Sequence, residues 1–181
     1  MSAPAGPVWP ALREAAQAFC PPLDVATETP QALKLVLHDP DAGASVTLRY
    51  RSERGLFLRT YYLVMEANVP GAGPDDPGRL MLRRRRLAWK RPKPRAGNAW
   101  GARLASDDMR ASLRALQVER LSIAWTPERE TWNVSLETLS GSLTVTFFPA
   151  LMTPNPLHRE EAEAFLSLLR AVRAATSRTP A

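Results

Sequence analysis

Apolar residues recur at steps of three and four positions in three segments of the chain, which is the spacing of one buried helix face. The first segment runs from Trp9 to Phe19 and ends at two prolines, which stop a helix. The second follows Ser106, a residue type that caps helix N-termini, and the third covers residues 157–172. The spacing therefore predicts an N-terminal, a central and a C-terminal helix.

Between these helices, apolar and polar residues alternate, as in strands with one buried and one solvated face. Strands are expected within residues 32–37, 46–51, 56–66, 79–87, 120–125, 132–137 and 143–147. Short turns at 126–130 and 139–142 would join the last three strands as hairpins. The order predicts an α+β domain. Its antiparallel sheet would consist of two meanders, of four and then three strands, with the three helices packed on one face.

The length and composition indicate one domain rather than several. The chain has 181 residues, of which 45% are hydrophobic, so it can bury a substantial core without disulfides or metals. We expect a single domain over residues 8–175, with flexible ends at 1–7 and 176–181. Residues 88–103 show no periodicity and contain two prolines and two glycines. They are expected to form a long basic surface loop.

The sequence contains no targeting signal or catalytic motif that we recognise. The first ten residues contain three prolines and no basic residue, unlike a secretory signal, and no stretch approaches about 20 apolar residues. We therefore expect a cytoplasmic protein without integral membrane association. Its one cysteine and two histidines cannot form a zinc cluster, and the common nucleotide-binding and hydrolase motifs are absent. No catalytic residue, metal or cofactor is predicted, and the protein is expected not to be an enzyme.

Charge is concentrated in one stretch of the chain. Residues 79–103 contain ten basic residues and no acidic one, whereas the remaining 14 basic and 18 acidic residues carry a net charge of −4. A cationic stretch of this density attracts polyanions such as nucleic acid. Consecutive arginines in a strand point to opposite faces, and buried guanidinium groups are costly. The tract is therefore expected at an edge of the sheet or beyond it.

Trp89 and Trp100 flank the expected loop within this basic tract and could stack on bases, while arginine binds phosphate through two hydrogen bonds. The sequence thus predicts a protein that binds the phosphate backbone of DNA or RNA without sequence specificity. The expected nucleic-acid-binding residues are Arg79, Arg83, Arg84, Arg85, Arg86, Trp89, Lys90, Arg91, Lys93, Arg95, Trp100 and Arg103.

Other interpretations of the same residues stay open. Consecutive arginines also protect an edge strand against aggregation, and 21 of the 24 basic residues are arginine, which is typical of a GC-rich coding sequence. The two flanking tryptophans could equally close the core. The alternative function is a protein-interaction or chaperone-like adaptor, with the apolar segment 147–152 or the outer sheet face as docking surface and the arginines as steering charge. A lipid surface and a homodimer through an edge strand also stay open.

Overall fold

The computed structural model describes residues 8–38, 45–74, 78–83, 86–90 and 95–177, with the backbone alone described for 83, 86–90 and 95–99. The helices of this part are α1 (Val8–Gln17), α2 (Arg95–Leu104), α3 (Asp107–Arg114) and α4 (Arg159–Thr176). The strands are β1 (Asp24–Thr29), β2 (Lys34–His38), β3 (Ser45–Arg54), β4 (Leu58–Pro70), β5 (Arg79–Arg83), β6 (Arg86–Lys90), β7 (Val118–Thr126), β8 (Thr131–Phe147) and β9 (Ala150–Pro154).

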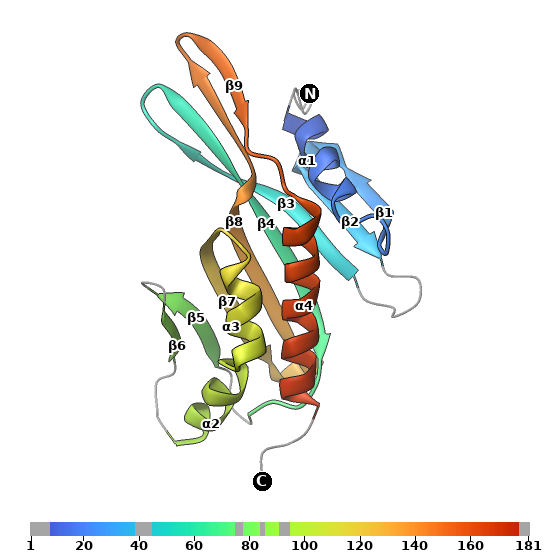
Figure 1. The fold of residues 1–181 in the computed structure, drawn as a ribbon, viewed down its shortest axis with the longest axis vertical. Helices are drawn as coiled ribbons and strands as arrows, with labels where there is room; N and C mark the ends of the chain where they lie inside the picture. The colour runs from blue at the N-terminus through green and yellow to red at the C-terminus, as the bar shows by residue number, and fades with distance from the viewer. Residues whose placement is uncertain (1–7, 39–44, 75–77, 84–85, 91–94, 178–181) are drawn as a thin grey trace.

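The nine strands of the described residues form one antiparallel sheet (Figure 1). Its order is β1-β2-β3-β4-β8-β7-β5-β6, and β9 pairs with the last part of β8. The predicted α+β class with an antiparallel sheet is confirmed. The division into two meanders is not confirmed, because strands from the two halves of the chain interleave: β8 pairs with β4, and β7 pairs with β5.

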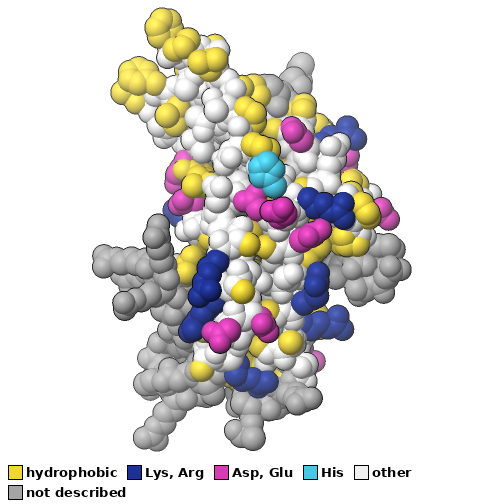
Figure 2. Space-filling model, viewed as in Figure 1, with side chains coloured by type: hydrophobic (Ala, Val, Ile, Leu, Met, Phe, Trp, Pro, Cys, Tyr) yellow, Lys and Arg dark blue, Asp and Glu magenta, His cyan; other side chains and the backbone are white. Residues whose placement is uncertain are grey.

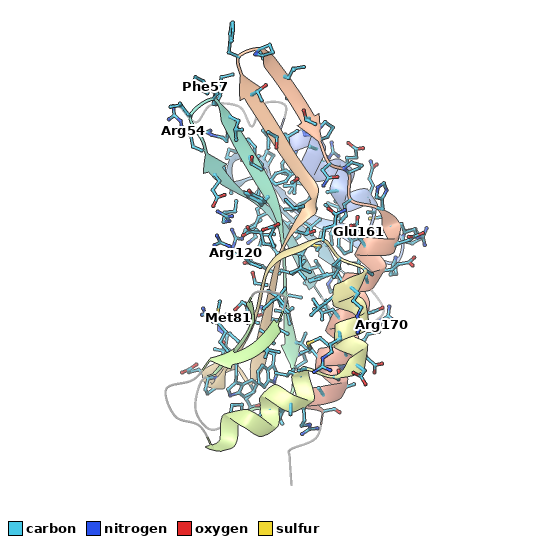
Figure 3. All side chains as sticks on the ribbon, turned by 60° about the vertical axis from the view of Figure 1, so that its left-hand side comes forward. Arg54, Phe57, Met81, Arg120, Glu161 and Arg170 are labelled. Carbon is cyan, nitrogen blue, oxygen red and sulfur yellow. The ribbon has the colours of Figure 1, made fainter. Side chains whose placement is uncertain are left out.

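The core lies between this sheet and the helices. Alternate side chains of the central strands, among them Leu48, Met65 and Leu136, are fully buried. In Figures 1 and 3, α3 and α4 run side by side along one face of the sheet. Phe19, just after α1, packs edge-on against Phe165 of α4, with 6.3 Å between ring centroids. Apolar spacing in the sequence thus identified the helix faces that close the core.

Strand β8, the longest of the described strands, runs through residues 139–142, where the sequence predicts the turn of a hairpin. β8 continues without reversal from Thr131 to Phe147, and its residues pair with β4 on both sides of that point. Gly141 adopts a φ of +76°, a backbone conformation that glycine reaches without strain. The predicted turn is therefore a local irregularity within a continuous strand, and 13 residues of β4 provide the partner that keeps the two halves together.

Three other sequence predictions need correction. β1 was missed because this edge strand is exposed along nearly its whole length and shows no alternation. The expected single strand 79–87 is instead the antiparallel pair β5–β6. The expected loop 88–103 contains the end of β6 and, from Arg95, helix α2, because burial of Trp100 and Leu104 four residues apart outweighs the low helix propensity of two glycines.

At the two ends of the domain, the structure agrees with the predictions only in part. Ser106 caps α3 as expected, and its Oγ accepts a hydrogen bond from the Met109 N–H at 3.4 Å. Thr176, expected in a flexible tail, is instead fully buried at the end of α4, and its carbonyl oxygen accepts a hydrogen bond from the Ala72 N–H at 2.8 Å. The expected flexible residues 1–7 and 178–181 lie outside the described residues.

Candidate functional site

The basic tract begins on a hairpin at one edge of the sheet. β5 pairs with β7 on one side and with β6 on the other, and β6 is the last strand of the order. Across this hairpin, Arg79 is the partner of Lys90 and Arg83 is the partner of Arg86. Like charges placed directly opposite each other destabilise a strand pair. The register brings four basic residues of the tract onto two neighbouring strands at this edge of the sheet.

The structure describes the predicted interface residues to different extents. Side chains are described for Arg79, Trp100 and Arg103. The backbone alone is described for Arg83, Arg86, Trp89, Lys90 and Arg95, whereas Arg84, Arg85, Arg91 and Lys93 lie outside the described residues. Arg79 is exposed and pairs with Ala124 of β7. Its neighbour Leu80 is buried, so Arg79 occupies the face of the sheet opposite the core.

Trp100 does not have the role that the sequence suggested for it. Only 3% of this residue is exposed, and its ring packs 5.6 Å from that of Trp132 in the core. The guanidinium group of Arg103 lies over the Trp100 ring, 5.2 Å from its centroid. Trp100 therefore closes the core, which was the alternative interpretation of this residue. It does not offer a platform on which a base could stack. The four-residue spacing between Trp100 and Leu104, which is typical of one buried helix face, is the sequence feature that indicates this burial.

A network of ion pairs that the sequence did not predict lies on the outer face of the sheet, the face opposite α4. Arg49 donates two hydrogen bonds to Glu66, at 2.8 and 3.1 Å. Arg51 donates two to Glu137, at 2.6 and 2.7 Å, although only 8% of the Glu137 side chain is exposed. Charge-assisted, two-bond pairs of this kind fix the orientation of both side chains. These two pairs place four charged side chains in fixed positions on the outer face.

A shallow hollow of about 190 Å³ lies within this outer face, beside β5. Its charged lining consists of Arg49, Arg51, Arg120 and Glu137, and Val64 and Met81 are among its apolar lining residues. Arg120 is held loosely, since its Nε lies 3.9 Å from Glu137 Oε1 and 70% of its side chain is exposed. Figure 3 shows Arg120 and Met81 on the side of the sheet away from the helices. Since Arg49 and Arg51 are each paired with a glutamate, Arg120 is the most exposed cation of this lining.

The Arg49–Glu66 pair makes stability depend on pH. Hydrogen bonds from Arg49 lower the pKa of Glu66, and burial opposes this shift. Because the folded pKa lies below the unfolded value, the stabilisation is present above the unfolded pKa of about 4.3 and is lost as pH falls through the folded pKa. We expect Glu66→Gln to lower the free energy of unfolding by about 1 kcal/mol at pH 7.

Urea unfolding of both proteins at pH 7 and at about pH 3 measures this effect. The difference between native protein and Glu66→Gln should shrink towards zero at the lower pH, since glutamine mimics the protonated carboxyl group. Glu163→Gln is the matched control, because the Arg159–Glu163 ion pair of α4 is exposed on both sides. A difference that stays constant across this pH range would contradict the assignment.

The histidines of the described residues have structural contacts. The His38 Nδ1 atom lies 3.2 Å from Ser45 Oγ across β2 and β3, and the backbone N–H of His158 donates a hydrogen bond to Glu161 Oε2 at the start of α4. Within the described ranges, no three His, Cys, Asp or Glu side chains come together as ligands for a metal ion. None of the helices in this part of the chain is long and apolar enough to span a bilayer.

Comparison with known proteins places this architecture in a family. Residues 19–176 match the family described as "Protein of unknown function (DUF3156)". The chain belongs to the DUF3156 family. The match runs from Phe19, just after α1, to the last residue of α4, so the DUF3156 region contains the whole sheet, the basic hairpin and the outer-face hollow. No curated protein and no solved structure matches the chain.

Proposed function

We propose that this DUF3156 protein is a non-enzymatic binding protein that holds nucleic acid by its phosphate backbone, with the basic residues of 79–103 as the contact surface. The observation that carries the proposal is the charge distribution: ten basic residues and no acidic one occur in a stretch whose strands lie at the edge of the sheet. Arginine, which supplies most of these charges, binds phosphate through two parallel hydrogen bonds.

The outer face next to the hairpin supports this proposal. Arg79 is exposed on β5, and Arg120 is largely exposed on the neighbouring strand β7. Both occupy the face opposite the core, beside a hollow in which Arg49 and Arg51 are already paired with Glu66 and Glu137. A duplex or single strand lying along the hairpin could therefore extend over this face. The buried Trp100 is not part of the proposed contact, so affinity would come mainly from phosphate contacts.

Fluorescence anisotropy with labelled single-stranded and double-stranded DNA and RNA tests the proposal. If six to eight phosphates are contacted, affinity should fall by roughly 10³ or more between about 50 and 200 mM salt. Changing Arg83, Arg84, Arg85 and Arg86 together to glutamine should weaken binding at least tenfold at low salt and reduce the salt slope by about 4.

The control removes the same charge from other elements of the fold. Arg110, Arg159, Arg170 and Arg173 are exposed on α3 and α4, and their change to glutamine should leave most of the affinity intact. Thermal unfolding of both variants verifies that they fold. The proposal fails if the native protein shows no binding at 50 mM salt, or if the two variants lose affinity equally.

A further inference from the structure

Two hairpins at one end of the molecule carry a group of exposed apolar side chains. We call this group the tip surface; it consists of Leu56, Phe57, Leu58, Phe147, Phe148, Leu151 and Met152, which are 40–89% exposed. The first three belong to the β3–β4 hairpin and the others to the β8–β9 hairpin. A hydrogen bond from the Phe147 N–H to the Phe57 carbonyl, at 2.9 Å, joins the two hairpins.

The tip surface projects beyond the helix-covered body. Figure 1 shows both hairpins extending past the start of α4, and Figure 2 shows apolar side chains gathered at this end. Exposed apolar side chains are ordinary when they are scattered, but a contiguous group of them at the end of a projection marks an interaction site. The sequence alone indicates only the segment 147–152 as a docking surface, and for a protein partner.

Apolar side chains lie on both faces of the projecting sheet. Leu58 and Leu151 are both cross-strand partners of Thr146, so they share one face. Phe147 follows Thr146 and Met152 follows Leu151. Since successive residues of a strand point to opposite faces, Phe147 and Met152 lie on the other face. A protein partner docked on the sheet would cover one of these faces. A lipid interface surrounds a narrow tip on all sides, which suits this two-sided distribution.

Two arginines lie at the base of the tip surface. Arg54 and Arg59 are direct cross-strand partners, and no acidic side chain of the described residues forms an ion pair with either. Arg59 Nη1 donates a hydrogen bond to the Tyr61 hydroxyl at 3.4 Å, whereas its Nε is buried without a hydrogen-bond partner. Residues 54–60 and 145–154 contain no acidic residue. Paired like charges destabilise the hairpin, and anionic groups between them would remove that cost.

We propose that the tip surface inserts into the interface of an anionic lipid bilayer. The seven apolar side chains would enter the boundary between headgroups and acyl chains, and Arg54 and Arg59 would lie at the level of the headgroup phosphates. The bound state is peripheral, since only hairpin ends enter the lipid. The tip surface and the β5–β6 hairpin lie at different places on the molecule (Figure 1), so this inference stands independently of nucleic-acid binding.

Sedimentation with vesicles of phosphatidylcholine alone, or of phosphatidylcholine mixed with phosphatidylglycerol, tests the proposal. The native protein should bind the mixed vesicles and bind the neutral ones more weakly. Phe57→Ser and Leu151→Ser should each lower the partition constant by about tenfold. Arg54→Gln and Arg59→Gln should each lower it by about fivefold on mixed vesicles. Val25→Ser is the matched control, because Val25 is exposed on β1, away from the tip surface.

A fluorescent probe separates insertion from simple charge attraction, since the basic hairpin also attracts anionic vesicles. Phe148→Trp should gain a tryptophan signal that brominated lipids quench, and the glutamine variant of Arg83–Arg86 should retain vesicle binding with a weaker affinity. Phe57→Ser should leave nucleic-acid affinity unchanged, which distinguishes failure here from failure of the proposed function.

Three results would overturn the inference. The native protein could fail to bind mixed vesicles, or its binding could be lost only in the Arg83–Arg86 variant. Alternatively, light scattering could show a dimer that Phe57→Ser and Leu151→Ser dissociate without a change in vesicle binding. That result would assign the tip surface to a contact between protein chains.

Discussion

Trp132→Ala should lower the free energy of unfolding by about 3–5 kcal/mol, the range for removing a large aromatic side chain from a core. Trp132 is fully buried on β8, and its ring packs 5.2 Å from Trp125 and 5.6 Å from Trp100. Its Nε1–H also donates a hydrogen bond to the Ala72 carbonyl at 2.9 Å. The substitution therefore opens a cavity between β7, β8 and α2 and leaves a carbonyl group without its donor.

Urea unfolding followed by circular dichroism measures this loss, and the corresponding fall in Tm should be about 6–20 °C. Trp132→Phe should cost less, because it keeps an aromatic ring in the site and loses mainly the hydrogen bond. Trp9→Ala on α1 is the control for removal of a tryptophan that is only half-buried. A loss below about 1 kcal/mol for Trp132→Ala would mean that this cluster does not organise the core.

Gly141→Ala should destabilise the protein by about 2–5 kcal/mol through two effects that add. An alanine at a φ of +76° costs about 1–2 kcal/mol in the left-handed region, and crowding of the core costs about 1–3 kcal/mol. The new Cβ would lie 2.5 Å from Leu63 Cδ2 and 3.3 Å from Leu157 Cβ. The backbone cannot move away freely, because the Gly141 carbonyl accepts a hydrogen bond from the Tyr50 hydroxyl at 2.7 Å.

Tryptophan fluorescence during urea unfolding reads out the effect of Gly141→Ala. The control is Gly55→Ala, since a Cβ at that position would meet Leu58 at 3.4 Å, an ordinary contact, and should change stability by no more than about 0.5 kcal/mol. Equal losses at the two glycines would show that the irregularity in β8 tolerates a side chain, contrary to the structure.

Local patterns predicted those parts of the fold where one face of an element is buried. Alternation identified the strands around Leu48 and Leu136, and helical spacing identified α1, α3 and α4. β1 shows no alternation of apolar and polar residues in the sequence, because none of its residues is buried. The continuity of β8 was not predictable locally, since Gly141 resembles a turn residue and only pairing with a distant strand keeps the chain extended there.

The candidate surfaces were predictable to different degrees. The count of charged residues identified the basic tract. Its edge position was predictable too, because burying arginine is costly whichever strands are its neighbours. The pairs Arg49–Glu66 and Arg51–Glu137 join residues 17 and 86 positions apart, so only the sheet register reveals them. Only part of the tip surface could be predicted. The apolar segment at Phe148 is evident in the sequence, but its contact with the hairpin of Phe57 depends on β4 lying beside β8.

The unbroken course of β8 has a mechanical consequence. Seventeen residues at about 3.3 Å each give this strand a contour of about 55 Å, so one strand extends from the tryptophan cluster to the Phe148 end. Strand β4 pairs with β8 on both sides of residues 139–142, which have no partner in β4. A force that tilts the end of the two hairpins is therefore passed to the hydrophobic core through β4, whose 13 residues bridge the irregularity at Gly141.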